Sequence, residues 1–249
     1  MACIGRPGDC GLSETNLMDR RKIFFTAAFG LLFVFASAQE NYQKIFSTDY
    51  DKAIRFLKEE ELWMDELIRA YGLKPKEVKA VIFPELIRYN AIQDKIETFA
   101  LESLYIQYGK DYANFSIGQF QLKPSFAETI EIDFLKLFGP SQSRVISKIK
   151  AGDTIQNVAS RDSRLKKLKD NKSVLNYVCF FFKIVETKYP TWKTEEEKIK
   201  FFACAYNSDY RKSKDEITSF ISKKFFYTGI IASRKYAYAE IAWYYFQHH

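Results

Sequence analysis

The chain has 249 residues, which is enough for one large domain or two small ones. Its net charge of +7 would attract anionic partners, but the sequence holds no basic repeat, zinc pattern or RNP-like motif, which argues against nucleic acid. The only histidines are His248 and His249, which argues against most Cys-His, Ser-His and His-ligated metal chemistry. We therefore expect no metal or cofactor, and we expect carboxylates to carry any acid–base catalysis.

Residues 18–39 have the pattern of an export signal. A basic start at residues 20–22 precedes a largely apolar run over residues 23–35, and Ala36-Ser37-Ala38 supplies the small residues that a signal peptidase needs before Gln39. The apolar run is short for a membrane span, which needs about 20 residues. The pattern predicts export to the periplasm or cell envelope, with an uncleaved anchor as the alternative.

The rest of the chain is expected to form one all-α domain. We expect residues 1–38 to be a leader and signal peptide and residues 39–249 to fold together, because no repeat or Pro/Gly/Ser-rich linker divides them and alternating strand patterns are absent. The expected helices cover residues 47–71, 75–85, 91–108, 125–138, 173–188, 195–207, 214–226 and 236–247. The apolar and aromatic segment 173–188 is expected to be the central buried helix. Cys179 and Cys204 lie in apolar helical stretches, where they either pair or pack as free thiols.

Glu85 is an unusual residue for its surroundings. It follows Pro84 in a helical pattern whose apolar face includes Val78, Val81 and Ile82. A proline inside a helix removes one backbone hydrogen bond and usually kinks the helix. We therefore expect Glu85 at a bent or terminal point of an apolar helix, where a carboxylate is uncommon.

A glycine turn precedes the helix expected from residue 125. Gly118 permits backbone angles that a Cβ forbids, so the chain can bend sharply and approach a ligand closely. Gln119 and Gln121 offer amide donors and acceptors of the kind that a sugar needs, and Pro124 suits the first turn of a helix. Such a turn is also an ordinary connector, so its function depends on whether a catalytic group faces it.

Three short segments follow one another in a defined order. They are Gly72-Leu73-Lys74-Pro75 with Ala80 and Glu85, then Gly118 to Ala127, then Ala205-Tyr206-Asn207. Together they resemble the soluble lytic transglycosylase family of the lysozyme-like superfamily, and the resemblance covers roughly residues 65–210. The family's turn reads Gly-Leu-Met-Gln-x-x-Pro-Ser-x-Ala. The positions that match it in register are Gly118, Gln121, Pro124, Ser125 and Ala127.

This resemblance implies a lysozyme-like helical domain that cleaves the MurNAc-β-1,4-GlcNAc bond of peptidoglycan glycan strands. A single Glu, here Glu85, would protonate the leaving oxygen, and the sugar's own 6-hydroxyl would attack in place of water to give a 1,6-anhydroMurNAc end. The substrate-binding positions that it implies are Ser116, Gly118, Phe120, Gln121, Tyr206 and Asn207. An apolar wall raises the pKa of such an acid, and the candidates for it are Phe83, Phe120 and Tyr206. An envelope protein complex is a further expected partner.

The chain departs from the family pattern in its spacing. Gly118 follows Glu85 by 33 positions, about twice the family's distance, which places an inserted helix near residues 91–108 between them. Glu102 lies 16 positions before Gly118 and is followed by the serine that the family has after its Glu. No Gly-x-x-Pro precedes Glu102 at the right offset, and a charged residue stands where the family has its small alanine. We therefore prefer Glu85 as the acid.

Two other functions stay open. A hydrolytic lysozyme would need a positioned water and usually a second carboxylate, for which Asp111 and Asp209 are the candidates. A non-catalytic peptidoglycan-binding envelope protein on the same scaffold is favoured by the changes next to Glu85 and after Asn207, where Ser208-Asp209 replaces the family's Ala-Gly.

Overall fold

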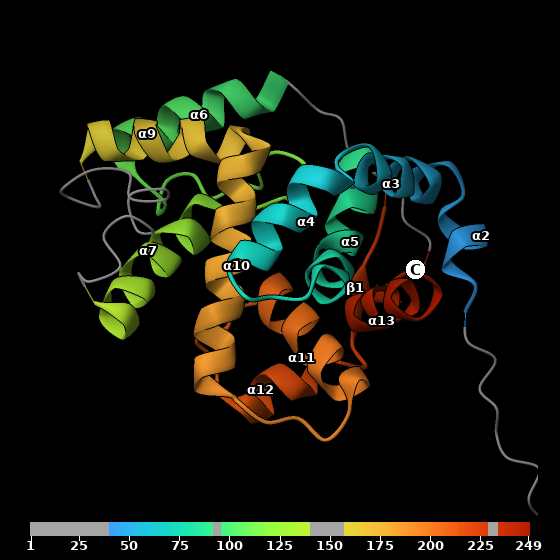
Figure 1. Ribbon diagram of the computed structural model, residues 1–249. Helices are drawn as coiled ribbons and strands as arrows, with labels where there is room; N and C mark the ends of the chain where they lie inside the picture. Colours follow the sequence, from blue (N-terminus) through green and yellow to red (C-terminus); the bar gives the residue numbers. More distant parts are fainter. Residues whose placement is uncertain (1–39, 92–95, 140–156, 229–233) are drawn as a thin grey trace, which may run out of the picture. The chain divides into compact units, whose positions relative to one another are not determined.

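The computed structural model describes residues 40–91, 96–139, 157–228 and 234–249, and almost all of its regular structure is helical (Figure 1). The chain divides into two units, Met1–Asn41 and Tyr42–His249, and every element described here belongs to the second. The helices are α2 (Tyr42–Phe46), α3 (Thr48–Glu59), α4 (Glu61–Ala70), α5 (Pro75–Ala91), α6 (Ile96–Tyr108), α7 (Pro124–Phe138), α9 (Val158–Lys169), α10 (Asn171–Lys188), α11 (Glu195–Asn207), α12 (Lys214–Ser219) and α13 (Tyr238–His248). The all-α class is therefore confirmed. The expected export signal lies outside the described residues, and none of the described helices combines the length and apolarity that crossing a bilayer requires.

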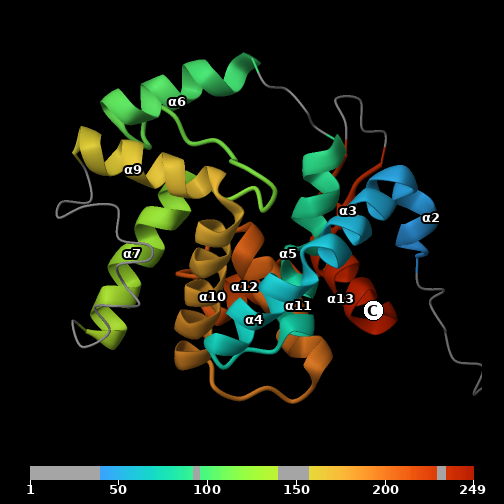
Figure 2. The ribbon, with the colours of Figure 1, turned by 45° about the horizontal axis from the view of Figure 1, so that its top comes forward.

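The helix α10 is the central buried helix that its sequence predicts. The Asp170 side chain caps its start by accepting a hydrogen bond from the Ser173 amide at 2.9 Å. Eleven of its residues are buried, so no face of the helix is left to water along most of its length. It packs against α7 and α9 and also against α4 and α11 (Figure 2). Cys179 lies on this helix, and like Cys204 on α11 it is buried and forms no disulfide.

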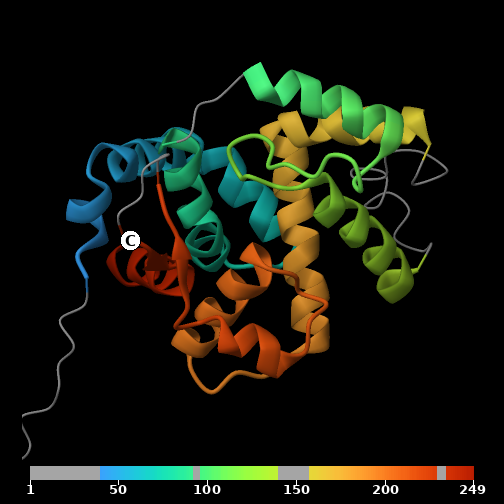
Figure 3. The same cartoon turned by 180° about the vertical axis from the view of Figure 1, so that it is seen from behind.

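The helix α5 is the second buried element, and it carries Glu85. Every residue from Glu77 to Ile87 is buried, so this helix also lacks a solvated face over its central turns. It packs against α3, α11 and α13, which surround it in the view from behind (Figure 3). The 17-residue helix continues for six residues beyond Glu85. Of the two positions expected for Glu85, the end of a helix is therefore ruled out, and Glu85 follows a proline inside α5.

The single helix expected over residues 47–71 is two helices, α3 and α4, which meet at Glu60. The buried positions Tyr50, Leu57 and Met64 recur every seven residues across the break, so the apolar pattern of the two helices is continuous. Hydrophobic periodicity alone could not reveal the break. Gly72 ends α4 in the left-handed conformation with φ of 71°, as expected.

The structure also contains two short strands, which the all-α expectation did not include. A two-stranded antiparallel sheet joins β1 (Lys224–Phe226) and β2 (Tyr236–Ala237), which pair Lys224 with Ala237 and Phe226 with Tyr236. Strands of three and two residues are too short to show an alternating pattern, so periodicity cannot detect them. The expected helix over 214–226 is consequently reduced to the six residues of α12.

Candidate active site

Glu85 is a buried carboxylate in the middle of α5. Only 4% of the residue is exposed, and burial raises the pKa of its side chain because the charged form loses its hydration. Three neighbours act in the opposite direction and stabilise the carboxylate: first Arg88, then the Tyr238 hydroxyl, then the more distant charge of Lys123. Burial outweighs them, so the pKa of Glu85 stays above its ordinary value. A raised pKa is what a carboxyl group needs to act as an acid near neutral pH.

Tyr238 can hydrogen-bond Glu85 in both of its protonation states. The Tyr238 hydroxyl bonds the Glu85 side chain and also lies 3.2 Å from the Val81 carbonyl oxygen. A hydroxyl has one proton to donate and two lone pairs to accept. When Glu85 is charged, Tyr238 donates to it, and when Glu85 is protonated, Tyr238 accepts from it and donates to Val81. The hydroxyl is fully buried and its pKa is well above its usual value, mainly through burial, so Tyr238 keeps its own proton.

Glu85 opens onto a polar cavity of about 350 Å³ that the glycine turn and the end of α11 also line. The lining residues are Glu85, Arg88, Asn114, Ser116, Gln121, Leu122, Lys123, Ser125, Phe126, Thr129, Tyr206, Asn207, Ser208 and Asp209. The structure thus brings residues from all three matched segments to one site. Five of the seven predicted site residues line it, and the exceptions are Gly118 and Phe120.

The glycine turn forms as its residues predict. Gly118 has a φ of 66°, and the turn is closed by the Ile117 amide donating to the Leu122 carbonyl at 3.1 Å. The helix α7 then begins at Pro124, in the first-turn position expected of it. Gln121 also has a positive φ of 49°, and its side-chain amide donates to the Gly118 carbonyl at 2.9 Å. Residues other than glycine rarely adopt this conformation, and the surrounding turn holds Gln121 in it.

Gly118→Ala is expected to destabilise the protein by about 2 kcal/mol, because a methyl group meets both a strained backbone angle and a close neighbour. A Cβ at Gly118 would lie 3.0 Å from the Leu168 carbonyl oxygen, which belongs to a helix backbone that cannot move freely. Gly72→Ala is the matched control, since its φ is 71° and nothing lies within 4 Å of the added atom. Chemical denaturation should show a larger loss for Gly118→Ala, and equal losses would mean that the contact with Leu168 has no effect.

Phe120 and Tyr206 both make contacts within the protein core. Phe120 is fully buried with its ring 6.1 Å from that of Phe56, and it does not line the cavity. The Tyr206 hydroxyl donates to the Phe120 carbonyl at 2.9 Å, which ties α11 to the turn. The pKa of Tyr206 is raised well above its usual value, mainly by burial and also by the charge of Glu85.

The apolar wall around Glu85 also differs from expectation. Phe83 packs against Tyr50 and Tyr245, with ring centroids 4.9 and 4.4 Å away, and it does not line the cavity. Tyr238 and Tyr206 lie near enough for the charge of Glu85 to act on both hydroxyls. No local signal could have found Tyr238, which is far along the chain. Arg88 was detectable, because residues three apart on a helix are neighbours.

Two of the three other acids considered for catalysis lie away from this cavity. Glu102 on α6 forms an ion pair with Lys169 at 2.7 Å and does not line the cavity. Asp111 lines a different cavity, of about 50 Å³. Asp209 is the only other carboxylate among the lining residues of the Glu85 cavity. Within the described ranges, no group of three or more His, Cys, Asp or Glu side chains could hold a metal ion.

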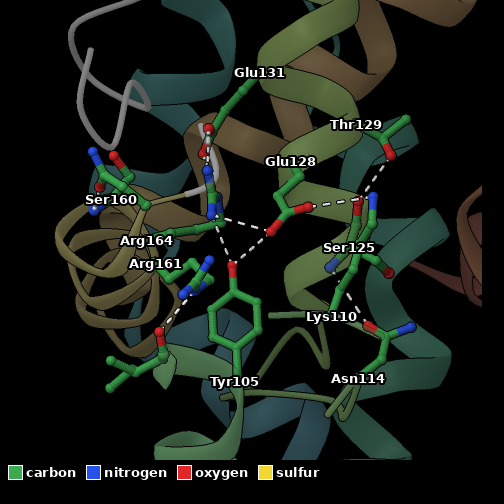
Figure 4. A network of polar contacts seen from close by, with 12 residues as sticks. Tyr105, Lys110, Asn114, Ser125, Glu128, Thr129, Glu131, Ser160, Arg161 and Arg164 are labelled. Carbon is green, nitrogen blue, oxygen red and sulfur yellow. Dashed lines mark hydrogen bonds and ion pairs between the residues drawn. The ribbon is translucent and has the colours of Figure 1, made fainter. Parts of the chain in front are cut away.

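A buried ion network holds α7, and with it the glycine turn, against α6, α9 and α10. Arg164 is completely buried and donates to Glu131 through Nε at 2.9 Å and Nη2 at 2.7 Å. Its Nη1 donates to the Tyr105 hydroxyl at 2.7 Å, and that hydroxyl donates to Glu128 at 2.9 Å (Figure 4). The Tyr177 hydroxyl of α10 donates to Glu131 at 2.7 Å. Lys110 also pairs with Glu128, at 3.4 Å, so two cations face two carboxylates and this cluster is a structural anchor.

Comparisons of the chain with protein-family models, with curated proteins and with solved structures find no match. The functional assignment therefore depends on the geometry of the Glu85 cavity and on the motifs that line it.

Proposed function

We propose that this protein is an exported peptidoglycan lytic transglycosylase with a lysozyme-like helical domain, and that Glu85 is its acid and base. The observation that supports this most directly is a buried carboxyl group with a raised pKa that faces a polar cavity. Gln121, Tyr206 and Asn207, from the other two matched segments, line the same cavity. A buried acid at the edge of a cavity with amide and hydroxyl groups suits the cleavage of a sugar polymer.

The proposed reaction needs one carboxyl group and no water. Protonated Glu85 gives its proton to the oxygen between MurNAc and GlcNAc, and the bond from that oxygen to C1 of MurNAc breaks. The 6-hydroxyl of the same MurNAc then bonds to C1, and the Glu85 carboxylate takes the hydroxyl proton. The products are a free 4-hydroxyl on GlcNAc and a 1,6-anhydroMurNAc end, and Glu85 is protonated again.

The polar lining would orient the glycan beside Glu85. Ser116, Gln121 and Asn207 present hydroxyl and amide groups to the cavity, and such groups fix the orientation of a polar ligand. Gln121 is held by its bond to the Gly118 carbonyl, so its side chain needs little ordering when a sugar binds. Tyr206 would hold the turn in place beside the glycan, because its hydroxyl already donates to the Phe120 carbonyl of the turn.

A hydrolytic lysozyme is the second candidate, and Asp209 is the observation that favours it. This residue lines the cavity together with Glu85, and most glycosidases use two carboxylates. One Asp209 oxygen accepts the Arg211 backbone amide at 2.9 Å, which leaves the other to hold a water. If the protein is a hydrolytic lysozyme, Asp209→Asn should abolish glycan cleavage. If it is a transglycosylase, Asp209→Asn should still cleave the glycan.

Peptidoglycan digestion followed by mass spectrometry separates these functions. A lytic transglycosylase gives products lighter by one water than hydrolytic muropeptides, because an internal hydroxyl has replaced water. Products of full hydrolytic mass would identify a lysozyme. If the mature protein binds peptidoglycan and releases nothing, the enzyme assignment fails and the non-catalytic wall-binding alternative holds.

A further inference from the structure

Arg88 forms an ion pair with the proposed catalytic acid. It lies three residues after Glu85 on α5, and its Nη1 donates to both Glu85 oxygens, at 3.0 and 2.9 Å. The Glu85 side chain is 5% exposed and the Arg88 side chain is 23% exposed. Arg88 is therefore the partner that a molecule in the cavity can reach.

This pair works against acid catalysis. A guanidinium group remains charged at all relevant pH values, and at hydrogen-bond distance it stabilises the charged carboxylate over the protonated acid. Glu85 must hold a proton to donate one. Burial already keeps the pKa of Glu85 above its ordinary value, and moving Arg88 to another partner would remove the largest effect that lowers this pKa.

The charges of the cavity indicate what the new partner is. Arg88 and Lys123 are its cations, and Glu85 and Asp209 are its carboxylates. Once Glu85 is protonated, the two cations face a single carboxylate, which leaves the cavity complementary to one negative charge. The guanidinium also lies over the Phe226 ring, at 4.8 Å from its centroid, and this contact can hold Arg88 in place while its polar end changes partner.

We propose that Arg88 is the receptor for a carboxylate of the substrate, and that it exchanges Glu85 for that carboxylate when the glycan binds. In this step the substrate carboxylate pairs with Arg88, and Glu85 takes up one proton from solvent. The other groups facing Glu85 do not provide this charge exchange: Lys123 acts on Glu85 only through its charge, and Tyr206 and Tyr238 keep their protons. The inference rests on the proposed function and specifies its substrate as a glycan that bears a free carboxylate on the muramic acid side of the bond.

Binding of soluble disaccharides tests the exchange without requiring cleavage. The probes are GlcNAc-MurNAc with a free lactyl carboxylate, its lactyl amide, and a form whose lactyl group carries a short peptide with a free carboxylate. Calorimetry in buffers of different ionisation heat measures both affinity and proton uptake. We expect the mature wild-type protein to bind a carboxylate form about tenfold more tightly than the amide. Proton uptake should be largest at pH values between the pKa of Glu85 in the free protein and its higher pKa in the complex. Whichever carboxylate form shows both effects identifies the source of the charge.

Replacing Arg88 and replacing Glu85 should change the affinity for the carboxylate probe in opposite directions. Arg88→Gln should bind all three probes with the affinity of the amide and without proton uptake. Glu85→Gln should bind the carboxylate form more tightly than wild type, because Arg88 no longer has a competing partner, and it should also take up no proton.

Two control variants accompany them. Arg88→Lys keeps the charge and should retain part of the preference for the carboxylate, which guards against a folding defect in Arg88→Gln. Arg69→Gln removes another arginine that pairs within its helix, with Asp65, and it should behave as wild type.

The outcomes separate this inference from the proposed function. Equal affinity of wild type for carboxylate and amide, failure to bind any probe, a preference that survives in Arg88→Gln, or carboxylate binding without proton uptake would each overturn the exchange. Cleavage of peptidoglycan together with any of these results leaves the transglycosylase proposal in place. Carboxylate preference and proton uptake without cleavage would retain Arg88 as a receptor and reject the enzyme.

Discussion

Glu85→Gln is expected to lower glycan cleavage by a factor of about 10² to 10⁴, because the variant has no proton to give to the leaving oxygen. Glutamine keeps the size of the side chain and can still accept hydrogen bonds from Arg88 and Tyr238, so the cavity should keep its shape. The measurement is the rate at which anhydro-ended products form from purified peptidoglycan. Full activity in Glu85→Gln would show that another group is the acid.

Glu102→Gln is the matched control for this variant. Glu102 has the alternative spacing to the glycine turn, but it is a buried carboxylate that pairs with the exposed Lys169, and it does not line the cavity. Glutamine keeps the size of this side chain and changes no group that lines the cavity. We therefore expect Glu102→Gln to cleave at the wild-type rate, and a loss comparable to that of Glu85→Gln would reverse the assignment of the acid.

The pH dependence of folding gives an independent check on Glu85. Its folded pKa lies above the ordinary value of 4.5, so the folded protein holds a proton that the unfolded chain has already lost. Stability should therefore fall as pH rises from 4.5 through the folded pKa. Glu85→Gln lacks this titration and should show a smaller fall over the same range. Denaturant unfolding of both proteins at several pH values measures the difference.

The local motifs predicted most of the site because their geometry is local. The positive φ of Gly118 and the helix start at Pro124 depend on a few neighbouring residues, and the structure contains both. The order of the three segments predicted that Glu85, Gln121 and Asn207 lie together, and all three line one cavity. The helix α6 lies between the acid and the turn in sequence without separating them in space.

The contacts that set the chemistry of Glu85 were not predictable in the same way. Tyr238 is brought to Glu85 by the packing of α13 on α5, which is a tertiary contact without a sequence signature. Phe120 was expected to face a sugar because of its neighbours in the motif, yet it is buried against Phe56. A motif specifies the backbone of a turn, whereas the direction of an apolar side chain depends on the core that receives it.

Arg164→Met is expected to cost about 3 to 5 kcal/mol of folding stability, the largest effect on stability among our predictions. Methionine fills a similar volume but removes every hydrogen bond that Arg164 makes. The Glu131 carboxylate would keep the Tyr177 hydroxyl as a donor and lose both bonds from the guanidinium. A buried carboxylate without its counter-charge is strongly unfavourable, so denaturant unfolding should show a large shift of the midpoint.

Two further variants test whether the unpaired Glu131 charge causes the loss of stability expected for Arg164→Met. Arg211→Gln removes an arginine that also bonds a carboxylate twice, Asp133 at 2.7 and 2.9 Å, but at an exposed position, so it should cost about 1 kcal/mol or less. Adding Glu131→Gln to Arg164→Met removes the orphaned charge and should recover a substantial part of the loss. If the double variant is no more stable than Arg164→Met, the cost comes from packing.

The position of this network also predicts how its loss affects activity. Arg164 binds Glu131 on α7, and α7 begins immediately after the turn that lines the Glu85 cavity. Arg164 itself does not line that cavity, so it has no direct part in binding or proton transfer. The Arg164→Met protein should therefore cleave glycan in proportion to its folded fraction, with activity restored at temperatures where it is fully folded. A defect that persists in fully folded protein would mean that the network also sets the geometry of the turn.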